Sequence, residues 1–557
     1  MADPNQGEWN IVKITVDNVE IELDSLVTAI HAHLIPILTE SESHPIGKVL
    51  YFHARYPSNY SYNDDPIPVF ITYLFDPETN ELTQYTVPRF PEDIGVEVDP
   101  SKLFCSGHTH LADGTLLVAG GERNQPPWGS NGTKYSFLFD SSVLDQQNPK
   151  PWKFTENLGT ITTMSRGRWY PQLTKLHDGT VVVMSGYPEQ PSSPEDTVII
   201  PERYDPATKI WTPYSNITDG LQIPTYNSAY VIPFGAWQGE IFYDMVAFGP
   251  DLQDWTGAHR FNPFSTATDY WNPVGSQSKP VRFHGCSVLL PIKPSDTDIR
   301  ILNIGGFGSA TGCEMIEIGS DTNTDWIPVP DTNYPRHDCP NAMLLADGSL
   351  IIIGGGDAET IVLVPEILDY SDPDPSNWVW NELTDSNAIM KVPRRYHSTA
   401  LFLPDASVWC AGSRKYSDPQ NFEFENDMER RIEIYRPGYL FEGTRPVIYD
   451  VPLTINYGEE YKFDLVLDVD NDPDILLDSI VLISMPSVTH CFDSNQRYVV
   501  LDFETISINK FSVTPPADRY IAPPGYYMLF VLKDKSQSWS EQAKIPSIAK
   551  IIKLEVA

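Results

Sequence analysis

The stretch HTHLADGTLLVAGG, residues 108–121, places an Asp-Gly turn between two strand-like runs and ends in two glycines. Asp-Gly between such runs is a strong signal for a β-hairpin. Clear copies of this unit lie at 172–186, 341–356 and 398–413, and weaker copies with longer or altered turns lie at 32–54, 228–249 and 287–306. Seven copies at intervals of roughly 50–65 residues predict a seven-bladed β-propeller of the kelch type.

The regions around these copies predict the remainder of an all-β fold. Aromatic segments such as 210–214 and 377–383 are expected to form outer strands of blades, and strands near the N-terminus are expected to close the ring. The repeat stops near Arg436, and residues 437–557 carry longer strand patterns typical of an immunoglobulin-like β-sandwich. We therefore predict a propeller over 1–436, a C-terminal sandwich over 437–557, and almost no helix.

Composition restricts the classes of partner. The net charge of −37 over 557 residues argues against nucleic acid and anionic membranes, because phosphate groups attract a basic surface. No run approaches the ~20 apolar residues of a membrane span, and the first residues lack the pattern of a secretion signal. The six cysteines form no CxxC pair, so a structural zinc site is not expected.

Polar residues open several of the predicted inner strands, where they would face the axis of the ring. They are Cys105 in FCSGHTH, Tyr170 in RWYPQL, and the pair Tyr396 and His397 in RRYHSTALFLP. The C-terminal region adds His490 in PSVTHCFDSNQR. Two phenols and two imidazoles suit tetragonal Cu(II). Since neighbours on a regular strand point to opposite faces, Tyr396 and His397 can share one metal only if the backbone bends there.

Six motifs in this order carry a resemblance to a known family. They are FCSGHTHLADGTLLVAGG, RWYPQL, RRYHSTALFLPD, IEIYRPGYLF, PSVTHCFDSNQR and APPGYYMLFVL. Together they resemble the copper radical oxidases, the family of galactose oxidase and glyoxal oxidase, and the chain is closer to the glyoxal oxidase branch. The resemblance extends over nearly the whole chain.

The resemblance implies a role for each of these residues. One copper ion would be held by Tyr170, Tyr396, His397 and His490, and Cys105 would form a thioether to the ring of Tyr170, which holds the radical. Tyr396 would act as the general base. The implied reaction couples the oxidation of a small aldehyde, as its hydrate, or of a primary alcohol to the reduction of O2 to hydrogen peroxide. A monomer is expected, and the family's members are commonly secreted.

Two other functions remain open. The same cofactor could act on larger primary alcohols or carbohydrates, as in galactose oxidase, or the ring could be a kelch scaffold for interactions without catalysis.

The pairs His31 with His33 and His108 with His110 have the i, i+2 spacing of a metal pair on a strand face. No role in the family matches them, so we expect packing or hydrogen bonding on inner strands.

An aromatic side chain covers the crosslinked tyrosine in galactose oxidase. Here the corresponding loop begins MSGYPEQ, and its nearest aromatic residue is Tyr187. Trp169 adjoins Tyr170, so on a regular strand it would point away from that ring. We therefore predict that Tyr187 lies over or beside Tyr170 and shields the radical.

Overall fold

The structure is a computed structural model of the 557-residue chain. It describes residues 6–556 apart from 17–18, 23–27, 40–41, 53–70, 89–102, 123–131, 190, 192–195, 218–219, 234–235, 238–239, 242–244, 249–257, 266–269, 275–281, 283, 320–324, 358–359, 415–427, 469–476 and 535–543.

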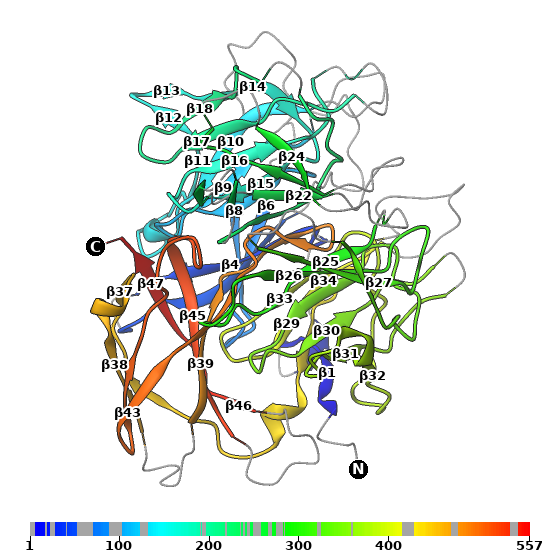
Figure 1. Ribbon diagram of the computed structural model, residues 1–557, viewed down its shortest axis with the longest axis vertical. Coiled ribbons are helices and arrows are strands. Elements are labelled where there is room, and N and C mark those ends of the chain that lie inside the picture. Colours follow the sequence, from blue (N-terminus) through cyan, green and yellow to red (C-terminus); the bar gives the residue numbers. More distant parts are fainter. Residues whose placement is uncertain are drawn as a thin grey trace.

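Seven antiparallel sheets follow one another, one for each predicted hairpin copy, and each contains a run of four strands that forms a blade (Figure 1). The sheet of the first blade is extended by two strands of the C-terminal region, and the sheet of the second blade by one further strand. The first blade contains β4 (His31–Ile37), β5 (Ile46–Phe52), β6 (Ile71–Phe75) and β7 (Leu82–Thr86), and the second contains β8 (Gly107–His110), β9 (Leu116–Ala119), β10 (Thr133–Phe139) and β11 (Trp152–Phe154). The third blade contains β15 (Gln172–Lys175), β16 (Val181–Met184), β17 (Glu202–Asp205) and β18 (Ile210–Pro213), and the fourth contains β19 (Ser228–Val231), β22 (Met245–Phe248), β23 (Ala258–Phe261) and β24 (Trp271–Val274). The other three are β25 (Cys286–Leu289), β26 (Ile299–Ile304), β27 (Cys313–Ile318) and β28 (Ile327–Val329); β29 (Asn341–Leu344), β30 (Leu350–Ile353), β31 (Glu366–Asp369) and β32 (Val379–Glu382); and β33 (Ser398–Phe402), β34 (Val408–Gly412), β35 (Glu433–Arg436) and β1 (Glu8–Ile11).

Short elements lie between the blades. They are β2 (Lys13–Val16), β3 (Val19–Glu22), β12 (Glu156–Asn157), β13 (Thr160–Ile161), β14 (Thr163–Arg168), β20 (Ala236–Trp237) and β21 (Glu240–Ile241). Among the described residues, helix is limited to the 3₁₀ turns Ser141–Val143, Pro375–Asn377, Gly438–Phe441 and Glu459–Tyr461. The predicted all-β propeller is confirmed.

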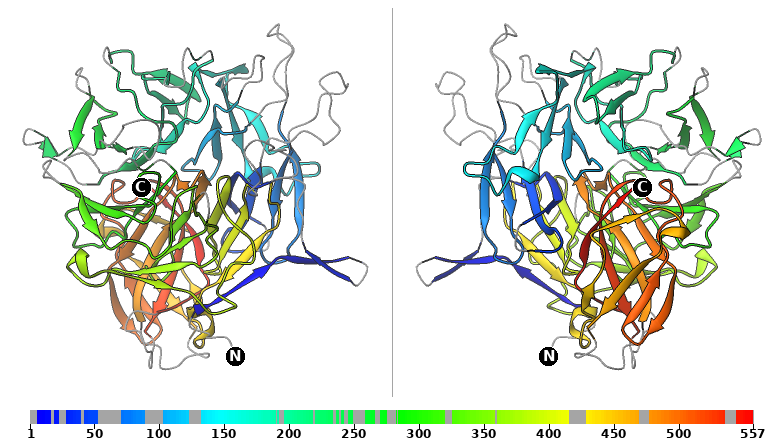
Figure 2. Two further views of the ribbon diagram at one scale, coloured as in Figure 1. Left: turned by 90° about the vertical axis from the view of Figure 1, so that its right-hand side faces the viewer. Right: turned by 90° about the vertical axis from the view of Figure 1, so that its left-hand side faces the viewer.

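The ring closes through the N-terminal strand, as expected. β1, near the N-terminus, pairs antiparallel with β35 (Figure 2). Trp9 lies opposite Tyr435 in this pairing, and the centres of the two stacked rings are 5.0 Å apart. The last blade therefore takes three strands from one end of the propeller sequence and one from the other. β1 thereby covers the outer edge of β35, which would otherwise be the last strand of the blade.

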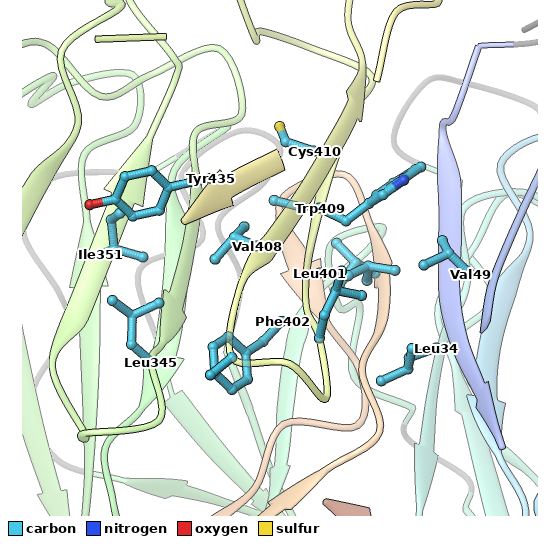
Figure 3. Close-up of a cluster of buried hydrophobic side chains, with 14 of the residues drawn as sticks. Leu34, Val49, Leu345, Ile351, Leu401, Phe402, Val408, Trp409, Cys410 and Tyr435 are labelled. Carbon is cyan, nitrogen blue, oxygen red and sulfur yellow. The ribbon is translucent and has the colours of Figure 1, made fainter. Parts of the chain in front are cut away.

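Residues after Arg436 form two further sheets beside the ring (Figure 1). One contains β36 (Ile448–Asp450), β38 (Phe463–Leu467), β44 (Lys510–Val513) and β43 (Phe503–Ser507), and the other contains β37 (Thr454–Asn456), β47 (Lys550–Glu555), β45 (Gly525–Lys533), β46 (Ile545–Pro546), β39 (Leu477–Ser484) and β42 (Tyr498–Leu501). The largest apolar cluster joins blade residues such as Leu401 and Trp409 (Figure 3) to Ile483 and Phe530 of this region. The division at 436/437 remains a prediction.

One hairpin of the C-terminal region leaves its own sheets and enters the ring. β40 (Ser487–Thr489) pairs with β41 (Phe492–Asp493) and, on its other side, with β4, so that Thr489 lies opposite His31. β40 also contacts β8 and β33, the first strands of two other blades. The hairpin therefore lies among the inner strands, and its tip carries His490.

A buried ion pair recurs in four blades. An arginine that precedes the first strand of the blade reaches a glutamate in its third strand, with nitrogen–oxygen distances of 2.7–3.0 Å: Arg168–Glu202, Arg282–Glu314, Arg336–Glu366 and Arg394–Glu433. Each guanidinium also donates to a carbonyl at the end of the second strand. The sequence analysis did not identify this repeat, although the Arg and Glu recur at matching positions.

The glycine pairs that end the second strands connect neighbouring blades. Gly306 donates its amide to the carbonyl of Arg336 in the next blade at 3.0 Å. The preceding Gly305 has φ +66°, and a Cβ there would lie 1.8 Å from that same carbonyl oxygen. Glycine is required because the two backbones approach too closely for any side chain.

Candidate metal centre

The candidate residues of the propeller occupy one structural position that repeats from blade to blade. Cys105 and Tyr170 lie two residues before β8 and β15, and His397 lies directly before β33. All three have left-handed backbone conformations, with φ of 55°, 63° and 67°. Non-glycine residues adopt this region rarely and at a cost of about 1–3 kcal/mol, and such residues gather at functional sites.

The same position is occupied by Tyr226, His284 and Cys339 in three further blades, with φ of 46°, 57° and 60°. Backbone hydrogen bonds connect successive members: the amide of Tyr226 donates to the carbonyl of Tyr170 at 3.0 Å, and that of Tyr170 donates to the carbonyl of Cys105 at 2.9 Å. Tyr226 and His284 were missed by the sequence analysis. Their spacing before each inner strand could have identified them.

His490 reaches the same region from the hairpin tip, where its φ is 46°. The hydroxyl of Thr489 donates to the carbonyl of Ile30 at 2.9 Å, so its oxygen accepts a hydrogen bond from Nδ1 of His490 at 2.7 Å. Burial lowers the pKa of His490 well below its ordinary value, so the ring is neutral. With the proton on Nδ1, Nε2 keeps the lone pair that a metal requires.

The predicted ligands come together in space. The phenol oxygens of Tyr170 and Tyr396 lie 3.2 Å apart, and the rings of Tyr396 and His397 lie 4.0 Å apart. The ligand atoms of Cys105, His397 and His490 all lie within 4.8 Å of one another. The left-handed φ of His397 is the bend that lets two consecutive side chains approach one centre.

Cys105 lies beside Tyr170, as a crosslink between them requires. The two residues belong to one buried cluster with Ile30 and Tyr226, and the thiol and the phenol form a side-chain hydrogen bond. Burial raises the pKa of Cys105 and of Tyr170 well above their ordinary values, and the charges of Cys105 and Tyr396 raise that of Tyr170 further. Both groups are therefore neutral without a nearby cation.

The aromatic residue stacked on Tyr170 is Trp169. The two ring centres lie 4.2 Å apart with planes at 26°, whereas Tyr187 contacts the indole at 5.7 Å. The expectation that Trp169 points away is wrong, because it assumed a regular strand and Tyr170 has φ of 63°. Tyr187 thus lies against the tryptophan, and its role in shielding remains a prediction.

A pocket of about 50 Å³ opens beside these residues, with Tyr170, Tyr226, His284, Tyr396, His490 and Cys491 in its wall. Tyr226 stacks on His490 at 4.5 Å and donates its hydroxyl hydrogen to the carbonyl of Ser106 at 2.9 Å. His284 stacks on Tyr396 at 5.0 Å. Since one water needs about 10–15 Å³ on this measure, the pocket has room for a molecule of only a few heavy atoms.

Three of the four paired histidines, His31, His33 and His108, belong to a buried hydrogen-bonded chain, whereas His110 contacts the carbonyl of Pro486. The amide of Cys105 donates to Nε2 of His31 at 3.0 Å, so Nδ1 of His31 donates to Nε2 of His108 at 3.2 Å. Nδ1 of His108 then donates to the hydroxyl of Ser487 at 2.8 Å, and that hydroxyl donates to Nδ1 of His33 at 3.0 Å. These residues hold Cys105 and the hairpin in place, as expected for hydrogen bonding rather than metal binding.

The chain is similar in sequence and in fold to several known oxidases. The family model described as galactose oxidase-like, early set domain, matches residues 445–554. The aldehyde oxidase GLOX of Vitis pseudoreticulata is 26% identical over 81% of this chain and 82% of its own length, and the galactose oxidase of Gibberella zeae is 24% identical over 89% and 66%. A fungal alcohol oxidase solved in complex with copper has a TM-score of 0.70 and 19% identity, covering 99% of this chain and 100% of its own.

Within the part of the chain that the structure describes, no helix has the length and apolarity needed to cross a bilayer.

Proposed function

We propose that the chain is a copper radical oxidase that couples the oxidation of a small aldehyde hydrate or primary alcohol to the reduction of O2 to hydrogen peroxide, as its similarity to an aldehyde oxidase and a galactose oxidase suggests. The observation that supports this most is the convergence of two phenols and two imidazoles, with the oxygens of Tyr170 and Tyr396 3.2 Å apart. These side chains come from two blades and from the inserted hairpin. Tyr170, His397 and His490 also have left-handed backbone conformations, which non-glycine residues adopt most often at functional sites.

The donor set fits copper. Phenol oxygens and imidazole nitrogens are ligands that Cu(II) accepts, and Thr489 leaves Nε2 of His490 available. Tyr170, Tyr396, His397 and His490 would hold the ion. Bound there, copper would act as a Lewis acid and accept one electron.

Cys105 and Tyr170 would form a thioether that makes the phenol easier to oxidise. The thiol loses its hydrogen, a ring carbon of Tyr170 loses another, and a sulfur–carbon bond forms. The two electrons and two protons released reduce one O2 to hydrogen peroxide. The cluster that holds these side chains together supports this assignment.

In turnover, Tyr396 would accept the proton of the substrate hydroxyl, and the oxidised Tyr170 would take a hydrogen atom from the adjacent carbon. Their 3.2 Å separation lets both phenols reach one carbinol group. The wall of the pocket, with His284 and Tyr226, would exclude larger molecules. Overall, one aldehyde hydrate and one O2 give one carboxylic acid and one hydrogen peroxide.

The limited room beside the two phenols, about 50 Å³ between Tyr226, His284 and Tyr396, favours small aldehydes over carbohydrates. A scaffold without catalysis is the other alternative. A scaffold of this kind would not require a thiol beside a phenol at the centre of the ring, or an imidazole from a separate hairpin.

The mass of the protein after aerobic treatment with Cu(II) tests the proposal. We expect the loss of two hydrogens and one crosslinked peptide that contains Cys105 and Tyr170. Cys105→Ser should abolish both the mass change and peroxide release. Cys410→Ser is the matched control, because Cys410 is equally buried but lies in β34 within the apolar core.

A panel of aldehydes and primary alcohols, read by peroxide release, then identifies the substrate class. We expect small aldehydes to react fastest. Retention of a freely alkylated Cys105 after copper treatment, together with no peroxide from any substrate, would contradict the proposal.

A further inference from the structure

A second cavity lies near the base of the inserted hairpin and is lined by two basic side chains. Its volume is about 30 Å³, and it lies among Lys175 of β15, Tyr230 of β19, Arg497 after the hairpin, and Tyr527 of β45. It therefore touches two blades, the segment that follows the hairpin, and a C-terminal sheet. None of these residues takes part in the proposed reaction.

Arg497 is buried, with 6% of its surface exposed. Its Nη2 donates to the carbonyl of Val231 at 2.9 Å, but its buried Nε and Nη1 have no hydrogen-bond partner among the described residues. In the described part of the chain, no carboxylate lies within 4.0 Å of the guanidinium. A guanidinium stays protonated in proteins, so this charge and these donors require a partner.

Lys175 adds a second cation to the same cavity. Its side chain is 7% exposed, and no described carboxylate lies within 4.0 Å of its ammonium. Burial and, to a smaller extent, the charge of Arg497 together lower the pKa of Lys175 to about 7. The two cations therefore oppose each other in this cavity, in a chain whose net charge is −37.

Asp493 lies on the wall of the cavity, but its carboxylate accepts hydrogen bonds from backbone amides of the hairpin. Its Oδ1 accepts hydrogen bonds from the amides of Ser487 and Asn495, each at 2.9 Å, and so it holds the turn of the hairpin. Neither Lys175 nor Arg497 forms an ion pair with it. Burial raises the pKa of Asp493 to about 6, which shows that no cation compensates it.

We propose that this cavity binds a small monovalent anion, with chloride as its occupant, between the ammonium of Lys175 and the unpartnered edge of Arg497. The anion neutralises both cations and accepts the two N–H groups that the protein leaves unpaired. A volume of about 30 Å³ corresponds to two or three waters, which suits a halide better than a larger oxyanion such as phosphate or sulfate. Because the cavity touches the hairpin base, bound chloride stabilises the docking of the hairpin that carries His490.

Halide crystallography and thermal unfolding test this site. Crystals grown in bromide should give an anomalous peak between Lys175 and Arg497. At constant ionic strength, replacing gluconate, which is too large for the cavity, by chloride should raise the unfolding midpoint by several degrees. Lys175→Met keeps the length of the side chain and should weaken the chloride effect at least tenfold, whereas Lys153→Met, at an exposed pair, should not change it.

The variant Asp493→Asn tests whether the carboxylate of Asp493, and not chloride, neutralises Lys175 and Arg497. The amide oxygen can still accept the backbone hydrogen bonds, and removal of the negative charge should strengthen the response to chloride. No bromide peak, or a chloride response equal in Lys175→Met and the parent protein, would show that only water fills the cavity and would overturn the proposal. A chloride response weakened by Asp493→Asn would also overturn it.

Discussion

At the scale of single residues, Thr489 controls which nitrogen of His490 is available. Its hydroxyl is fixed by the carbonyl of Ile30 and accepts the Nδ1 hydrogen of His490. Outer partners of this kind orient metal-binding histidines and set their tautomer. The histidine chain fixes the backbone of Cys105 in a similar way, because Nε2 of His31 accepts the hydrogen of the Cys105 amide.

Thr489→Val should weaken Cu(II) binding by about 10–100-fold, because the side chain keeps its shape but no longer accepts the Nδ1 hydrogen. Thr489→Ser keeps the hydroxyl and should bind nearly as the parent protein does. Isothermal titration with Cu(II) measures both. Equal affinity in the valine and serine variants would remove Thr489 from this role.

Trp169→Ala should shorten the lifetime of the oxidised Tyr170, since the indole covers one face of that ring at 4.2 Å. Tyr187→Phe keeps the contact with the indole and should change the lifetime little. The decay of the radical signal after oxidation compares the two. A shorter lifetime in Tyr187→Phe alone would restore Tyr187 as the shielding residue.

At the scale of elements, the blades show what could be read from the sequence and what could not. The Asp-Gly turns and glycine pairs predicted the hairpins, because a tight turn and a close backbone approach each restrict the residue type. Tyr170 and His397 were found because they open inner strands. The stacking of Trp169 and the insertion of the hairpin escaped prediction, since a left-handed residue and a strand pairing between residues 31 and 489 leave no local pattern.

The recurring arginine–glutamate pair should contribute strongly to the stability of each blade. Glu366→Gln leaves Arg336 with a buried charge that no carboxylate compensates, and we expect a loss of about 3–5 kcal/mol in the free energy of unfolding. Lys153→Met removes the exposed pair with Asp140 and should cost less than about 1 kcal/mol. Urea unfolding measures both, and similar losses would contradict the importance of burial.

At the scale of the whole molecule, buried histidines connect the ring to the C-terminal region. Burial lowers the pKa of His108 and of His110 from 6.5 to about 3. Between these values the unfolded chain binds protons that the folded protein does not, so stability falls as pH decreases through this range. The same two residues contact Ser487 and Pro486 on the inserted segment.

We therefore expect the urea midpoint to fall steadily from about pH 6.5 towards about pH 4. His110→Gln can still donate to the carbonyl of Pro486 but does not titrate, so its midpoint should depend less on pH. Chemical denaturation at a series of pH values checks this. A slope unchanged in His110→Gln would mean that other groups govern acid unfolding.

The closure of the ring has a consequence for biosynthesis. Blade seven needs both β1 and β35, so the ring cannot be complete until residues 433–436 have left the ribosome, and His490 follows 54 residues later (490 − 436). An unfinished or prematurely terminated chain therefore lacks one of the four proposed ligands. The proposed radical chemistry would therefore require translation to have passed the inserted hairpin, which would protect shorter nascent polypeptides from their own oxidant.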